Sequence, residues 1–176
     1  ELSAWYLSTF FMTKLVNTGH GYNYDNVRKW SKGRTRRNRH INLLDLTRMY
    51  IPINHNNLHW SLIVVDIGKN NIRYLDSLLP SNHGEEYCRR VLQYIKDDVA
   101  DKQQIQLDIA QWTITIGTTQ PQQENDVDCG MYVIMYADCL YHNFSLQLIE
   151  AEHISTLRKW VAISIYEDNV TSGESS

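Results

Sequence analysis

Three stretches in the middle of the chain have the hydrophobic pattern of β-strands. They lie at residues 48–53, 60–66 and 71–76, and residues 68–70 (Gly-Lys-Asn) form a turn signal between the last two. The stretch at 61–65 (Ser-Leu-Ile-Val-Val) is nearly all apolar, which is typical of a strand covered on both faces. The pattern therefore predicts an α+β domain rather than an open antiparallel sheet.

Helical periodicity appears before and after these strands. Residues 85–99 place apolar side chains at i, i+3, i+4 and i+7, with charges on the opposite face, and so predict a surface helix. Residues 112–116 alternate in polarity and predict one more strand. The other predicted elements are a short amphipathic helix at 6–16, a helical turn or two at 24–30, a strongly apolar helix beginning at Cys129, a last helix at 151–166 and a polar flexible tail at 167–176.

Length and composition fit one globular unit. A chain of 176 residues is long enough for one compact domain that buries roughly 70% of its unfolded surface. An apolar content of 43% and a charged content of 21% exclude disordered, collagen-like and coiled-coil proteins. No apolar run approaches the ~20 residues of a membrane span, and no leader pattern is evident, so we expect an intracellular protein without membrane contact. The three cysteines form no CxxC pair, which favours a reducing compartment.

The basic residues are unevenly distributed. Seven of the 17 lie within residues 28–39, where no acidic residue occurs, and the rest of the chain carries ten basic against 20 acidic residues. Such a run can be a solvated loop, a partner-binding surface, a nuclear-import signal or a weak nucleic-acid patch. Nucleic-acid binding is not expected, because no aromatic platform accompanies the charges.

Cys129 is the cysteine with the clearest chemical potential. It lies where a polar loop meets a buried helix, and the N–H groups and dipole at a helix start stabilise a thiolate. The alternative is a small buried hydrophobe, the usual role of free cysteine and the role we expect for Cys88 and Cys139.

A cysteine nucleophile needs a base and a group that orients the base. His59 precedes one strand of the predicted hairpin and Asp76 ends the next, so the two lie at the same end of the hairpin. From position alone, an ordinary strand-end histidine and a turn-forming aspartate are the more common explanation of these two residues.

Four sequence elements together resemble a known family. They are residues 52–53 with 58–62, residues 74–77 (Tyr-Leu-Asp-Ser), residues 121–124 (Pro-Gln-Gln-Glu) and residues 125–133 (Asn-Asp-Val-Asp-Cys-Gly-Met-Tyr-Val). This set resembles the ubiquitin-like-protein-specific cysteine proteases, the SUMO proteases of the Ulp and sentrin-specific types, related in fold to the adenovirus protease. The resemblance implies a papain-like α+β fold: a central mixed β-sheet flanked by helices, with a catalytic cysteine at the N-terminus of a buried helix. It also implies a single catalytic domain over residues 1–166.

The resemblance implies roles for five residues. Cys129 would attack the carbonyl of a terminal glycine, His59 would transfer the proton, and Asp76 would orient His59. The side-chain amide of Gln123 would stabilise the oxyanion, and Trp60 would bind substrate by lying over the diglycine tail. The implied function is an isopeptidase and C-terminal hydrolase that cleaves after the diglycine of a SUMO-like modifier, either in conjugates or in precursors. The implied enzyme needs no cofactor or metal, acts in the nucleus or cytoplasm, and has the modifier and its conjugates as partners. We expect a monomer, because nothing in the sequence demands a larger assembly.

Some features depart from the family pattern and keep alternatives open. Family members usually begin with a Trp-Leu-x-Asp element that Trp5 does not match, so we expect a catalytic core without that segment. The alternatives are a non-catalytic module that binds ubiquitin-like modifiers, a protease for NEDD8 or ubiquitin, and an acyltransferase of similar fold. A zinc site built from His55, His59 and a cysteine is a further alternative, but residues 52–57 look like a loop and no second ligand pair is present.

Overall fold

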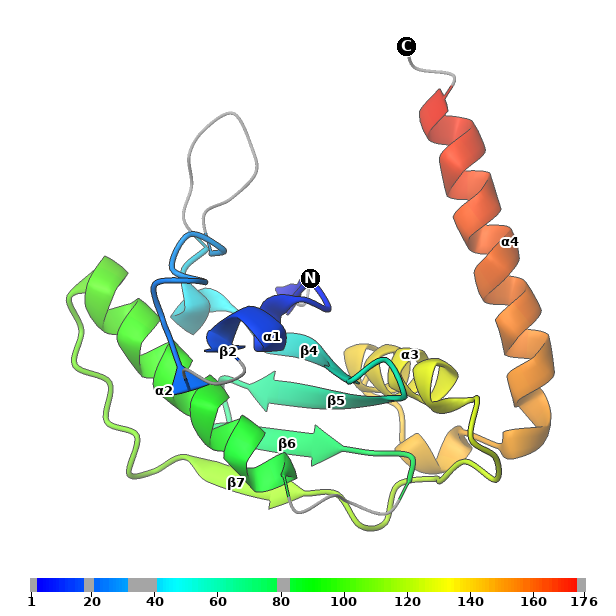
Figure 1. The fold of residues 1–176 in the computed structure, drawn as a ribbon, viewed down its shortest axis with the longest axis horizontal. Coiled ribbons are helices and arrows are strands. Elements are labelled where there is room, and N and C mark those ends of the chain that lie inside the picture. The colour runs from blue at the N-terminus through cyan, green and yellow to red at the C-terminus, as the bar shows by residue number, and fades with distance from the viewer. Residues whose placement is uncertain (1–2, 18–20, 32–40, 79–82, 174–176) are drawn as a thin grey trace.

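A mixed five-stranded sheet forms the centre of the molecule (Figure 1). The computed structural model describes residues 3–17, 21–31, 41–78 and 83–173. The strand order is β1-β4-β5-β6-β7; the inner pairs are antiparallel, whereas β1 with β4 and β6 with β7 are parallel. This confirms the predicted mixed sheet. The strands are β1 (Ala4–Tyr6), β4 (Arg48–His55), β5 (His59–Asp66), β6 (Asn71–Leu75) and β7 (Thr113–Ile116).

Helices cover both faces of this sheet, as the apolar sequence of β5 predicts. The short helix α1 (Phe11–Leu15) and the long helix α2 (Gly84–Gln103) pack on one face. The helix α3 (Cys129–Tyr141) packs on the other face, against β5. Ile63 of β5 belongs to the first core and Leu62 to the second, because successive side chains of a strand point to opposite faces.

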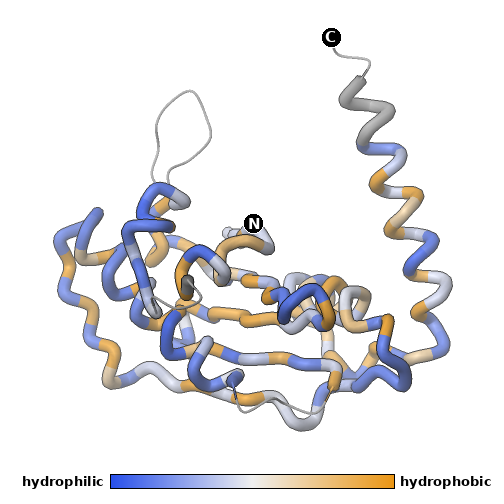
Figure 2. Tube along the Cα trace, viewed as in Figure 1, coloured by the Kyte–Doolittle hydropathy of each residue, from blue (hydrophilic) through white to orange (hydrophobic). Residues whose placement is uncertain are grey.

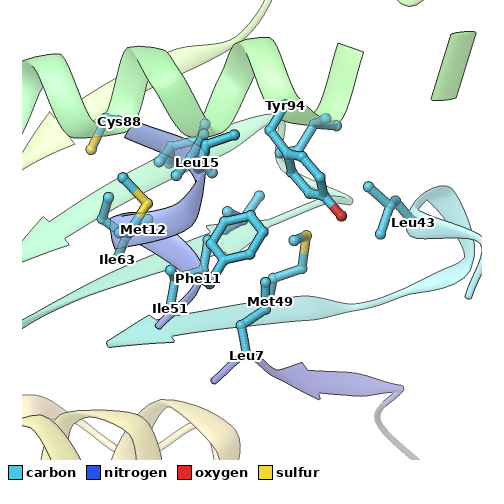
Figure 3. Packing of buried hydrophobic residues seen from close by; sticks show 14 of the residues in the cluster. Leu7, Phe11, Met12, Leu15, Leu43, Met49, Ile51, Ile63, Cys88 and Tyr94 are labelled. Carbon is cyan, nitrogen blue, oxygen red and sulfur yellow. The ribbon is translucent and has the colours of Figure 1, made fainter. Parts of the chain in front are cut away.

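The core between α1, α2 and the sheet is apolar and closely packed (Figure 3). The rings of Phe11 and Tyr94 meet edge to face with centroids 4.9 Å apart. At the start of α2, a β-carbon added to Gly84 would lie 2.6 Å from the ring of Tyr74, so this close approach requires glycine. The N-terminus of α2 is thereby held next to the end of β6.

A tight turn joins β4 to β5. Asn56 and Asn57 adopt left-handed backbone conformations with φ of 55° and 61°, which asparagine tolerates better than most residues. The two strands therefore pair up to His55 opposite His59. Pro52 fits in β4 because it lies beyond the last residue paired with the short strand β1, where no ladder donor is needed. The expectation of a loop over residues 52–57 is therefore wrong for residues 52–55, which belong to β4.

Other predicted elements differ from the observed ones at their ends. The expected helix at 6–16 is limited to α1, because residues 4–6 pair with β4 instead. Residues 24–30 form consecutive turns, and residues 167–173, expected as a flexible tail, continue the last helix α4 (Ile154–Gly173). The polar residues after 166 suggested the end of the helix. They do not end it, because no glycine or proline interrupts the helix before Gly173. The short elements are β2 (Val16–Asn17), β3 (Gly21–Tyr22) and the 3-10 helices η1 (Leu43–Asp45), η2 (Leu146–Leu148) and η3 (Ala151–His153).

The helix α4 extends away from the body after its first turns (Figure 1). Leu157 and Val161 pack against the second core, to which α3 contributes, whereas Trp160 and Tyr166 are exposed. Hydrophobic and hydrophilic positions intermix along α4, while the inner strands are more uniformly hydrophobic (Figure 2). Among the described helices, none combines the length and apolar character needed to cross a membrane.

Only part of the basic segment can be placed. Arg28 forms a bidentate pair with Asp101 of α2, with Nε–Oδ2 and Nη2–Oδ1 distances of 2.9 and 2.5 Å. Lys29 is exposed. The five other basic residues of this segment lie outside the described residues: Lys32, Arg34, Arg36, Arg37 and Arg39.

Candidate active site

His59 and Asp76 form a hydrogen-bonded pair at one end of the sheet. His59 Nε2 lies 2.6 Å from Asp76 Oδ1. The pair is largely shielded from water, since the side chain of Asp76 is 3% exposed and that of His59 18%. His59 begins β5 and Asp76 directly follows β6, so the antiparallel register brings them together.

The surroundings of Asp76 fix its carboxylate. The Leu78 N–H donates to Oδ1 at 2.9 Å, and the Tyr74 hydroxyl donates to Oδ2 at 3.1 Å. An ionised carboxylate only accepts hydrogen bonds, so His59 donates from Nε2. In the neutral imidazole Nδ1 is then the unprotonated nitrogen, free to take a proton from a nucleophile.

Cys129 is the first residue of α3, as predicted for a nucleophile. Its N–H is among the backbone donors at a helix start that have no partner inside the helix. The residue is 6% exposed. A β-carbon added to Gly130 would lie 3.9 Å from Cδ1 of Trp60, so the first turn of α3 lies against the start of β5. The structure thus brings Cys129 to the end of the sheet that carries His59.

Gln123 is buried in the loop before α3, and both ends of its side-chain amide are engaged. The Ser77 hydroxyl donates to Oε1 at 2.5 Å, and Nε2 donates to the Asn125 carbonyl. The Gln123 backbone N–H donates to the Ser77 carbonyl at 2.9 Å. Ser77 follows Asp76, so one short segment contacts both the histidine and the loop that leads to Cys129.

The loop before Cys129 is internally braced. Asn125 Oδ1 accepts hydrogen bonds from the Val127 and Asp128 N–H groups at 2.9 and 3.0 Å. Asp128 occupies the N-cap position of α3 without a side-chain cap, because its carboxylate binds the Asn125 amide and the Arg158 guanidinium of α4. These two donors hold the pKa of Asp128 below its usual range.

An apolar cleft of about 500 Å³ is lined by Gly130, the residue that follows Cys129. Trp60 and Gly130 form one end of its lining, and Leu7, Tyr50 and Ile134 continue it along α3 and the sheet. The expected substrate-binding residue Trp60 thus lines a cleft that reaches the first turn of α3.

The two other cysteines lie in ordinary core surroundings. Burial raises the pKa of the Cys88 thiol to about 12, and partial burial together with Asp138 raises the pKa of Cys139. A raised pKa keeps a thiol protonated and unreactive at neutral pH. This agrees with the expectation that neither residue is a nucleophile.

His55 contributes to the site in a way that the sequence did not indicate. Its ring stacks on that of His59 with centroids 5.7 Å apart, and its Nε2 lies 2.7 Å from Ser61 Oγ. Burial and the neighbouring His59 lower the pKa of His55. The sequence signal for this contact was the pair of asparagines at 56–57. They favour a tight turn, and a tight turn there places His55 opposite His59.

The zinc alternative finds no support in the described ranges. Among the described residues, the potential metal ligands whose ligand atoms lie close together in a group of three are Glu150, Glu152 and His153. All three side chains are exposed. His55 and His59 belong to no such group.

Comparison with protein families decides the relationship. The model of the Ulp1 protease family, C-terminal catalytic domain, matches residues 2–172. The chain belongs to the Ulp1 protease family.

Curated relatives agree with this family. The chain is 36% identical over 137 residues to ubiquitin-like-specific protease 1A of Arabidopsis thaliana, an alignment covering 78% of this chain and 26% of the relative. It is 38% identical over 134 residues to sentrin-specific protease 2 of Rattus norvegicus, covering 75% and 20%. The alignments therefore span only about a fifth to a quarter of the length of these two relatives.

Solved structures of Ulp1 have the same fold. The SUMO protease Ulp1 with its catalytic cysteine oxidised to a sulfonic acid superposes with a TM-score of 0.78 at 27% identity, over 95% of this chain and 70% of that chain. The C-terminal Ulp1 protease domain in complex with Smt3, the yeast ortholog of SUMO, gives a TM-score of 0.66 at 29% identity, over 82% and 59%. These likenesses confirm the predicted α+β protease fold.

Proposed function

We propose that this Ulp1-family domain is a cysteine protease that cleaves after the terminal diglycine of a SUMO-like modifier. The observation that carries the proposal is the buried His59–Asp76 pair at the sheet end reached by Cys129. A hydrolase specific for a peptide or isopeptide bond needs such a base, oriented and protected from water. Membership of the family and the complex of Ulp1 with Smt3 support the choice of modifier.

The reaction begins with Cys129. His59 Nδ1 takes the thiol proton, and the sulfur attacks the carbonyl carbon of the terminal glycine. The C–N bond then breaks, the imidazolium returns its proton to the leaving amine, and a thioester remains on Cys129. His59 next accepts a proton from water, whose oxygen attacks the thioester carbon. The C–S bond then breaks, the modifier leaves with a free carboxylate, and the imidazolium returns its proton to the sulfur of Cys129. Asp76 keeps Nε2 protonated and so holds Nδ1 as the base through both steps.

The tetrahedral intermediates place negative charge on the former carbonyl oxygen. We assign its stabilisation to the Cys129 N–H and the Gln123 amide. Removing one such donor costs about 3 kcal/mol in other enzymes, roughly 10²-fold in rate. Trp60 borders the apolar cleft, and we assign it to the substrate tail, where residues without a β-carbon fit most easily against a large ring.

Cleavage of precursors tests this proposal. The reduced protein is incubated with SUMO, NEDD8 and ubiquitin, each carrying a short extension after its diglycine, and the products are identified by mass. The matched variants are Cys129→Ala and Cys139→Ala, which each remove one of the two cysteines of α3. We expect cleavage of the SUMO precursor by the unmodified protein and by Cys139→Ala, and none by Cys129→Ala.

Two results would contradict the proposal. Undiminished cleavage by Cys129→Ala would show that Cys129 is not the nucleophile. Binding of modifiers with no turnover of any precursor or lysine-linked conjugate would identify a non-catalytic binding module. Cleavage of NEDD8 or ubiquitin alone would keep the enzyme and correct its substrate. We place this activity in the nucleus or cytoplasm, where modifier conjugates are formed.

A further inference from the structure

Ser77 and Gln123 are joined twice, although 46 residues separate them. The Ser77 hydroxyl lies 2.5 Å from Gln123 Oε1, and the Ser77 carbonyl accepts the Gln123 N–H at 2.9 Å. Ser77 is 1% exposed and Gln123 9%. Water therefore does not compete effectively for these hydrogen bonds, which makes them stronger than exposed ones.

The partners determine which way the Gln123 amide faces. The Asn125 carbonyl can only accept a hydrogen bond, so the nitrogen of the amide must face it. The oxygen then faces Ser77, and the serine hydroxyl must be the donor. Both ends of the amide are thus specified, and its plane is fixed.

This arrangement leaves one donor unused. A side-chain amide nitrogen carries two hydrogens, and among the described residues Asn125 is the acceptor the structure gives it. The second hydrogen remains for a group that forms during the reaction. A donor fixed in advance stabilises a developing oxyanion better than one that must first rotate.

We propose that Ser77 is a positioning residue that holds the Gln123 amide ready for the oxyanion. This rests on the proposed function, in which Gln123 supplies one oxyanion donor. Without the hydroxyl, Oε1 has no donor, and the broad terminal torsion of glutamine lets the amide turn. Because the oxyanion exists only in the transition state and intermediates, the loss falls on kcat rather than on KM.

A double-mutant cycle on SUMO-precursor cleavage tests the proposal. The variants are Ser77→Ala, Gln123→Ala and their combination. We expect Gln123→Ala to lower kcat about 10²- to 10³-fold. Ser77→Ala should lower kcat roughly 10-fold with KM changed by less than about twofold, and should have almost no further effect once Gln123 is alanine.

Ser31→Ala is the matched control. Ser31 is also fully buried, and its hydroxyl lies 3.0 Å from Asp98 Oδ1 beside α2, away from the site. The variant Ser31→Ala should have a lower free energy of unfolding but an unchanged kcat. If Ser77→Ala does not fold, Ser77→Cys keeps the shape of the side chain at a slightly larger volume and with a weaker donor. It should lower kcat by a smaller factor, and only while Gln123 is present.

The outcomes separate the two claims. An equal loss of kcat from Ser77→Ala with and without Gln123 would show a general structural effect and overturn the positioning role. The positioning role would also be overturned if Ser77→Ala left kcat unchanged while Gln123→Ala lowered it. An unchanged kcat in Gln123→Ala would remove Gln123 from the proposed function, and the role of Ser77 with it. Full activity of Cys129→Ala would instead reject the proposed function itself.

Discussion

His59 and Asp76 lie 17 residues apart in the sequence, yet Nε2 and Oδ1 are 2.6 Å apart. The register pairs Leu62 with Leu75, so the next residues along, Ser61 and Asp76, face each other across β5 and β6. His59 lies two positions before Ser61 on the same face of the strand, within diagonal reach of Asp76. A regular hairpin is therefore sufficient to build the pair.

Replacing Asp76 by asparagine tests this pair. We expect Asp76→Asn to fold and to lower kcat/KM roughly 10²- to 10⁴-fold, because an amide no longer fixes the protonated nitrogen of His59. Asp66→Asn is the control, since Asp66 lies at the other end of β5 and pairs with Arg48. Precursor cleavage kinetics and thermal unfolding of both variants provide the measurement. Similar activities for the two variants would show that Asp76 does not orient the base.

The reactivity of the three thiols should differ. With limiting iodoacetamide at pH 7, peptide mapping should find Cys129 alkylated first. In the proposed mechanism His59 assists loss of its proton, whereas the pKa values of Cys88 and Cys139 are raised. The variant His59→Ala should slow labelling of Cys129 and leave the other two rates unchanged. Equal labelling of Cys129 and Cys139 in the unmodified protein would speak against an activated nucleophile.

His55 should make the fold sensitive to mild acid. Its pKa is lowered in the folded state by burial first and then by His59 and His83, against an opposing effect of Asp76. The unfolded chain therefore takes up a proton near the ordinary pKa of about 6.5 before the folded one does, and stability falls as the pH drops through that value.

The variant His55→Gln isolates this effect. It keeps a polar group near Ser61 but cannot titrate, so its free energy of unfolding should fall less between pH 7.5 and 5.5. Denaturant unfolding at the two pH values measures the difference. The same fall in both proteins would show that His55 does not contribute to it.

The central strand should dominate stability. Ile63 is fully buried in β5, and Ile63→Ala should cost about 2–5 kcal/mol of the free energy of unfolding, since it removes contacts and leaves a cavity. Ile105→Ala is the control; Ile105 is 45% exposed, and the expected change is within about 0.5 kcal/mol. Equal costs would contradict the packing described for the first core.

The sequence predicted the sheet well because its signals are local. The apolar run of β5 and the turn at 68–70 define the hairpin, and the hairpin brings His59 to Asp76. The predicted start of α3 at Cys129 also holds, since a polar loop and an apolar helix meet there.

Contacts between distant segments were harder to predict. Nothing local marks Ser77 as a partner of Gln123, because their meeting depends on how the loop before α3 returns to β6. Likewise, residues 4–6 pair with β4 through a parallel contact that no short-range pattern encodes. The length of α4 was missed because residues 167–173 are mostly polar, which suggested a tail, and none of them is a proline that would end a helix.

The central claim is that Cys129 is the nucleophile of a protease for SUMO-like modifiers. The most direct measurement is the intact mass of the reduced protein after incubation with a SUMO probe carrying an electrophile in place of its C-terminal glycine carboxylate, with NEDD8 and ubiquitin probes alongside. We predict one covalent adduct with the SUMO probe, located at Cys129 by peptide mapping and missing in Cys129→Ala. An adduct that persists in Cys129→Ala, or no adduct with any of the three probes, would contradict the account.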